Sequence, residues 1–77
     1  METENTMNNN KVYEETIGLA ADSLVEAWCA EDAGEHADES AKWFRSYVSE
    51  LVNDGYDRDD VVRDARARAR ESYMELA

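Results

Sequence analysis

The sequence contains no proline, three glycines, and a single residue each of cysteine and histidine. One cysteine cannot form an internal disulfide, and Cys29 with His36 provides too few ligands for a zinc site. The glycines lie too far apart for a phosphate-cradling loop. No apolar run approaches the ~20 residues that a membrane span requires. The first residues also lack the basic and apolar segments of a signal peptide. We therefore expect a cytoplasmic protein without metal or cofactor.

Basic residues are scarce and unevenly distributed. The chain has 19 acidic and 8 basic residues, for a net charge of −11, and Lys11 and Lys42 are its only lysines. Residues 1–40 hold 11 of the acids and one base, whereas residues 41–77 hold 8 acids and 7 bases. Like charges repel, so we expect no direct contact of the first half with nucleic acid or with an anionic membrane.

The apolar pattern predicts an all-α, compact three-helix bundle. Residues 1–10 are polar and predict a frayed, flexible leader, followed by a single helical domain over 11–77. Within that domain we expect helices over 11–30, 37–53 and 58–76. Asn10 and Asp57 are the expected N-caps, and Gly34 and Gly55 the expected turn residues. At 77 residues the chain can bury only a modest core, so a homodimer is one candidate assembly.

Spacings of three and four predict one buried stripe on each helix. The alanines of the third helix permit close packing. The predicted stripes are Tyr13, Ile17, Ala20, Ala21, Leu24 and Trp28; Ala37, Ala41, Phe44, Val48 and Leu51; and Val62, Ala65, Ala69, Tyr73 and Leu76.

Catalytic patterns are weak, and we expect no enzyme. Cys29 and His36 could be imagined as nucleophile and base, but neighbouring carboxylates disfavour a thiolate, and a packed or half-packed thiol is expected. Adjacent carboxylates such as Asp59 and Asp60 are typical of a helix start. Residues 32–39 do not have the spacing of a calcium loop.

Residues 12–41 hold nine carboxylates and no Lys or Arg. A helix rises 1.5 Å per residue, so such carboxylates repeat on a length scale similar to the ~1.7 Å per charge of B-form DNA. We expect them to form one acidic contact surface for a basic protein: Glu14, Glu15, Asp22, Glu26, Glu31, Asp32, Glu35, Asp38 and Glu39.

In its size, its charge and the acidic stretch Glu14–Glu39, the chain resembles the small acidic inhibitors carried by phages and mobile elements. Those proteins act against restriction, CRISPR or recombination nucleases by occupying a nucleic-acid channel. The resemblance implies a non-enzymatic DNA mimic of anti-restriction or anti-CRISPR type. Such a protein would act in the host cytoplasm and bind a nucleic-acid-binding enzyme or complex.

Two alternatives stay open at this point. One is a small helical interaction or regulatory module that works through an apolar patch formed by Trp43, Tyr47, Val52 and Tyr56. The other is a homodimer whose acidity serves only solubility or salt adaptation.

The arginines of the third helix also have two interpretations. Arg63, Arg66 and Arg70 share one helix face. We expect them and Arg68 to pair with carboxylates of the same helix or of the first helix, with Asp59 and Arg63 at a suitable spacing. The alternative is a contact with a small anion or with nucleic acid, which the net charge of −11 disfavours.

Overall fold

A computed structural model describes the backbone of residues 2–76 and the side chains of residues 11–76. Three helices make up the fold, α1 (Glu2–Asp32), α2 (Asp38–Asn53) and α3 (Arg58–Leu76). The predicted all-α three-helix bundle is confirmed, and α2 and α3 begin and end within one residue of their predicted bounds. No helix among the described residues combines the length and apolar character needed to cross a membrane.

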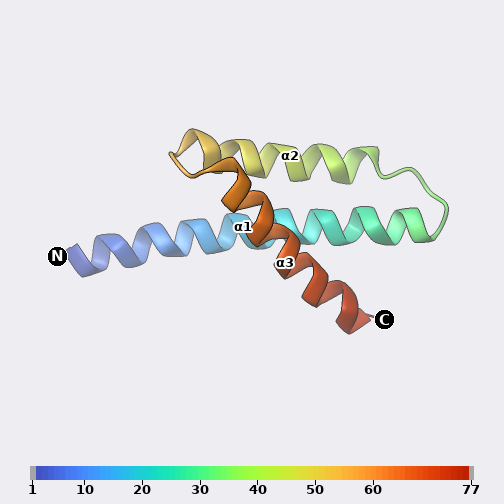
Figure 1. Cartoon of the computed structure of the whole chain (residues 1–77), viewed down its shortest axis with the longest axis horizontal. Helices are drawn as coiled ribbons and strands as arrows, with labels where there is room; N and C mark the ends of the chain where they lie inside the picture. Colours follow the sequence, from blue (N-terminus) through green and yellow to red (C-terminus); the bar gives the residue numbers. More distant parts are fainter. Residues whose placement is uncertain (1, 77) are drawn as a thin grey trace.

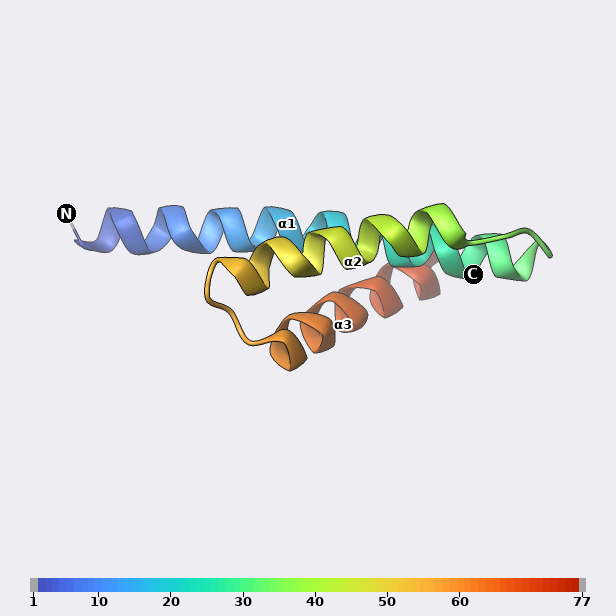
Figure 2. The same cartoon turned by 90° about the horizontal axis from the view of Figure 1, so that it is seen from above.

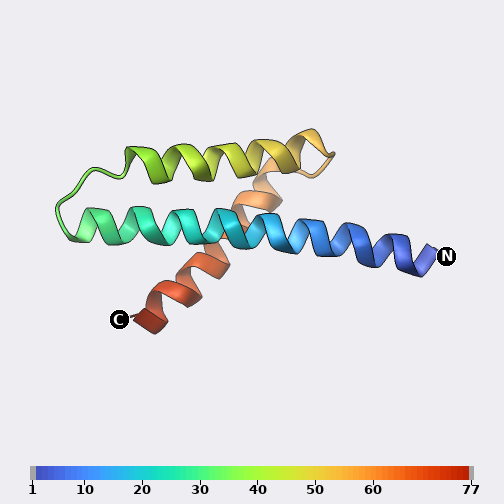
Figure 3. The same cartoon turned by 180° about the vertical axis from the view of Figure 1, so that it is seen from behind.

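Helices α1 and α2 form an antiparallel hairpin, and α3 crosses α1 obliquely on one face of that hairpin (Figure 1). Figure 2, seen from above, places α3 to one side of the α1/α2 pair. Seen from behind, α1 and α2 lie in front of α3, so the second face of the hairpin is left uncovered (Figure 3). Helix α1 is therefore the central element, in contact with both of the others.

Both connections use the same turn. The N–H groups of Gly34 and Glu35 donate to the carbonyls of Glu31 and Ala30, at 3.0 and 2.8 Å. After α2, Gly55 and Tyr56 repeat these two bonds to Val52 and Leu51. This pair of bonds is the Schellman motif, which requires a left-handed residue after the helix. Gly34 and Gly55 have φ of +77° and +107°, which confirms their predicted role.

The core is small and follows most of the predicted stripes, but it also contains Val25 and Ala27 of α1, which no predicted stripe included. One buried cluster joins all three helices: Ile17 and Ala20 of α1, Val48 and Leu51 of α2, and Val61 and Ala65 of α3. A second cluster lies along α1 and α3, with Ala21, Val25 and Ala69 buried beneath Leu24, Trp28 and Tyr73. Alanines at both α1/α3 contacts let these helices approach closely.

The first helix is longer than the sequence predicted. It begins at Glu2 rather than at Lys11, so Asn10 lies inside the helix and is not its N-cap. The physical reason is the lack of a helix breaker, because no proline or glycine occurs before Gly18. The early turns of α1 project beyond the other helices (Figure 1), and their predicted flexibility stays a prediction.

Two details of the α3 stripe were wrong. Val61 rather than Val62 is fully buried, although Val62 packs at the margin of the same cluster. Leu76 is 70% exposed instead of buried. Because α3 crosses α1 at an angle, its end runs past the hairpin (Figure 1), and Leu76 there lines an open hollow instead of the core.

Candidate partner-binding surface

All nine predicted contact carboxylates are exposed. Glu14, Glu15, Asp22 and Glu26 lie along α1, and the other five surround the connection between α1 and α2. The helical period sets three of the four α1 carboxylates apart from Glu14. Glu15, Asp22 and Glu26 fall within about 40° of one another around the helix axis, on the side away from the buried stripe. We call these three residues the acidic strip, which extends about 16 Å along α1.

A second group of carboxylates surrounds the α1/α2 connection. We call Glu31, Asp32, Glu35, Asp38 and Glu39 the acidic end. Asp38 and Glu39 occupy the first turn of α2, where the helix dipole favours negative charge. Glu31 and Asp32 occupy the last turn of α1, which contains no basic residue. Negative charge is unfavourable at that end of a helix, so both carboxylates oppose the dipole of α1.

The protein's own side chains engage two of the nine carboxylates. Arg68 of α3 pairs with Glu14, as expected for an arginine facing the first helix. The hydroxyl of Tyr73 donates to Asp32, and this hydrogen bond, with some desolvation, raises the pKa of Tyr73. Among the side chains of residues 11–76, the other seven form no ion pair. Most of the predicted acidic contact surface therefore has no counter-charge among the side chains of residues 11–76.

The acidic strip borders a hollow between α1 and the last turns of α3. The hollow has a volume of about 420 Å³ and is lined by Asp22, Val25 and Glu26 from α1 and by Ser72, Glu75 and Leu76 from α3. Glu75 was not among the predicted site residues, because its position beside α1 depends on the crossing of the two helices. Three carboxylates and two aliphatic side chains thus face one opening. Such a lining suits the apolar stem and cationic head of a lysine or arginine.

The alternative apolar patch is divided by the fold. Trp43 is 50% exposed and stacks on Tyr47, with ring centroids 6.1 Å apart. Tyr47 and Val52 both pack against the core, and Tyr56, which is 37% exposed, packs on Tyr13 of α1 at 4.6 Å. The patch is therefore divided, and Trp43 and Tyr56 are its exposed members.

Two expectations about single side chains need correction. Cys29 is exposed rather than packed, because the helical period turns Trp28 toward Tyr73 and Cys29 toward solvent. Arg63 pairs with Asp60 at 2.6 Å and not with Asp59. Within the described residues, no cluster of His, Cys, Asp and Glu side chains is arranged to hold a metal ion.

The fold and the surface define a small three-helix protein with an exposed, largely uncompensated acidic face. Comparison with known protein families, with curated proteins and with solved structures finds no match.

Proposed function

We propose that this protein is a non-enzymatic inhibitor that binds the basic, nucleic-acid-binding surface of another protein. One observation carries the proposal. Seven exposed carboxylates lie along α1 and around its end, and no cation among residues 11–76 pairs with them. A groove built to hold phosphates presents lysine and arginine side chains at intervals of a few ångströms, which such a surface complements.

The acidic strip would supply the directional part of the contact. Its carboxylates project from a rigid helix, so little conformational entropy is lost in positioning them for a partner. The hollow beside Asp22 and Glu26 accepts one basic side chain, whose stem lies against Val25 and Leu76. The acidic end extends the same negative potential beyond the helix, which accelerates encounter with a basic partner.

The position of Glu31 adds independent support. A carboxylate in the last turn of a helix opposes the helix dipole, and no basic residue of α1 relieves it there. Residues that oppose folding stability are common where a surface serves binding.

The test is capture from a bacterial lysate with three immobilised proteins. These are the wild type, an Asp22→Asn/Glu26→Gln/Glu75→Gln variant and a Glu50→Gln/Asp54→Asn/Glu71→Gln control. Both variants lose three exposed carboxylates, so their net charges match, and only the first alters the hollow. We expect the wild type and the control to retain a basic nucleic-acid-binding protein at low salt. The Asp22 variant should retain it at least about tenfold less well, equivalent to about 1.4 kcal/mol.

Added duplex DNA and high salt should each release the captured protein from the wild type, since DNA competes for the same groove. Equally weakened capture by both variants would show that binding depends on net charge alone and not on the hollow. Retention only of proteins that do not bind nucleic acid, or capture that duplex DNA cannot reverse, would refute the proposal.

A second candidate function follows from Trp43, whose half-exposed indole stacks on Tyr47. Exposed tryptophans are frequent anchors of protein interfaces. An interaction module of this kind would lose its partner on Trp43→Ala and would bind with little dependence on salt. The same capture experiment, repeated with this variant, separates the two functions.

A further inference from the structure

The outer face of α3 carries a row of arginines, most of which form no ion pair with the described side chains. A groove of about 410 Å³ is lined by four arginines, Arg58, Arg63, Arg66 and Arg70, together with Asp59, Val62 and Ala67. Arg63 is paired with Asp60, whereas Arg58, Arg66 and Arg70 form no ion pair with side chains of residues 11–76. In a protein with a net charge of −11, free arginines gathered on one helix face are unexpected.

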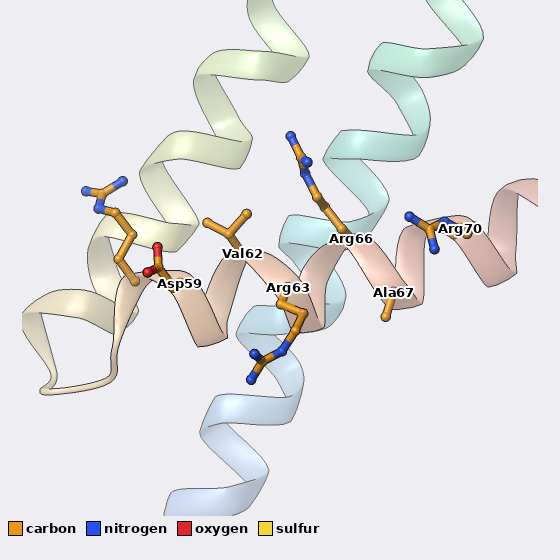
Figure 4. A pocket seen from close by; sticks show the side chains of 7 residues that line it. Asp59, Val62, Arg63, Arg66, Ala67 and Arg70 are labelled. Atoms are coloured by element: carbon orange, nitrogen blue, oxygen red, sulfur yellow. The ribbon is translucent and has the colours of Figure 1, made fainter.

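The lining of the groove also contains apolar side chains. Figure 4 shows Arg63 and Arg66 extending to opposite sides of α3, with Val62 nearer the start of the helix and Ala67 nearer its end. Because Ala67 is small, an apolar side chain can approach the backbone of α3 there. Such a surface fits an α-helix that carries carboxylates with an aliphatic residue among them.

The outer face of α1 has this composition. Glu15, Leu19, Asp22 and Glu26 follow one another at spacings of four, three and four residues. Asp59, Arg63, Arg66 and Arg70 on α3 have the identical spacing. Alternation of three and four residues is the pattern that lets two helices pack lengthwise. Leu19, 49% exposed, supplies the aliphatic residue within the acidic strip.

We propose that the arginine groove of α3 binds the acidic strip of a second copy of this chain. Asp22 and Glu26 of one copy then face Arg66 and Arg70 of the other. In the same register Leu19 lies beside the stem of Arg63, and Glu15 opposite Asp59 is a like-charge pair that the two opposite-charge pairs outweigh. Exposed ion pairs are individually weak, so this association is reversible and requires high protein concentration. It goes beyond the proposed function, because it needs no basic partner protein.

The contact would also cover the surface assigned above to the partner. Self-association and partner binding then compete for the acidic strip, and a basic partner dissociates the assembly as it binds. Two molecules of charge −11 repel one another at long range. A salt concentration of about 0.15 M, with a screening length of ~8 Å, weakens that repulsion more than it weakens ion pairs in direct contact.

Sedimentation velocity at about 0.15 M salt, over protein concentrations from about 10 µM to about 1 mM, tests the proposal. The wild type should associate. Arg66→Glu/Arg70→Glu and Asp22→Lys/Glu26→Lys should each weaken this association at least about tenfold. An equimolar mixture of the two variants should associate again, because the first variant keeps an intact acidic strip and the second keeps an intact arginine groove. Lys42→Glu/Arg45→Glu, which changes two exposed bases of α2, has the same charge change as the arginine variant and should behave as wild type.

A wild type that stays monomeric throughout this range would overturn the proposal. So would normal association of the Arg66/Arg70 variant, or a mixture that remains monomeric while circular dichroism shows both variants folded. Because Arg66→Glu/Arg70→Glu leaves every carboxylate of the acidic surface in place, it should still capture a basic partner from lysate. The two proposals can therefore fail separately.

Discussion

Tyr13 is the side chain at which three parts of the chain meet. Its hydroxyl donates to Asp64 of α3, and its ring packs against Tyr56 after α2. Partial burial raises the pKa of Tyr13 to about 12, and the hydrogen bond to Asp64 acts in the same direction, as do the charges of Asp64 and Asp60. The protonated phenol is therefore the form that the folded state favours.

Tyr13→Phe should destabilise the protein by about 0.5–1.5 kcal/mol at neutral pH, the usual net value of one hydrogen bond. The folded pKa lies above the unfolded value of about 10. The contribution of this proton is thus complete below pH 10 and is lost as the pH rises through about 12. In urea titrations the variant should lose less stability over that alkaline range than wild type does. Tyr47→Phe, whose hydroxyl has no hydrogen bond among residues 11–76, is the control, and equal stability of Tyr13→Phe and wild type at pH 7 would contradict the assignment.

The exposure of the α1 carboxylates was predictable from the sequence, whereas their contacts with α3 were not. The helical period alone places Glu15, Asp22 and Glu26 on the outer side of α1. The pairing of Glu14 with Arg68, and the approach of Glu75 to Asp22, depend on the angle and rotation of α3 against α1. No local pattern within either helix determines these two quantities.

At the scale of the helices, two glycines with opposite roles give a matched pair of variants. Gly55 has φ of +107°, and Gly18 lies within α1. A Cβ atom at either position would meet nothing within 4 Å, so only backbone conformation decides the outcome. Gly55→Ala should cost about 1–2 kcal/mol, and Gly18→Ala should gain about 0.5–1 kcal/mol. Thermal melts should therefore shift in opposite directions, by roughly 4–8 °C per kcal/mol. A rise in Tm for Gly55→Ala would show that the turn can reorganise.

The helix bounds were predictable wherever the sequence carries a local stop or start. Asp57 accepts a hydrogen bond from the N–H of Asp60 at 3.2 Å, as an N-cap does, and Gly55 ends the turn before it. The beginning of α1 had no such marker, and the predicted start at Lys11 was nine residues late. The exposure of Leu76 was also unpredictable. The angle at which α3 crosses α1 decides where along α3 the contact between the two helices ends, and the sequence of α3 does not determine that angle.

At the scale of the whole molecule, charge opposes folding. With a net charge of −11 and two ion pairs among residues 11–76, repulsion between carboxylates is relieved mainly by dissolved salt. The Tm should therefore rise as sodium chloride increases from about 0.01 M to about 1 M, over which the screening length falls from ~30 to ~3 Å. The Asp22→Asn/Glu26→Gln/Glu75→Gln variant should show a smaller rise. Circular dichroism melts provide the measurement, and a Tm that falls with salt would contradict this account. A cooperative melt in dilute buffer would in addition argue against a protein that requires salt to fold.

The oblique placement of α3 gives the two tryptophans different environments. Trp28 meets Tyr73 edge-to-face at 5.5 Å, and this pair bridges α1 and α3, whereas Trp43 lies on α2 with half of its surface in solvent. The indole of Trp28 is consequently a natural optical reporter of whether the last helix is seated. In a Trp43→Phe variant, the fluorescence emission of Trp28 reports the packing of α3 against α1, whereas circular dichroism reports the total helix content. The fluorophore needed to time that step in a stopped-flow instrument is already present in the chain.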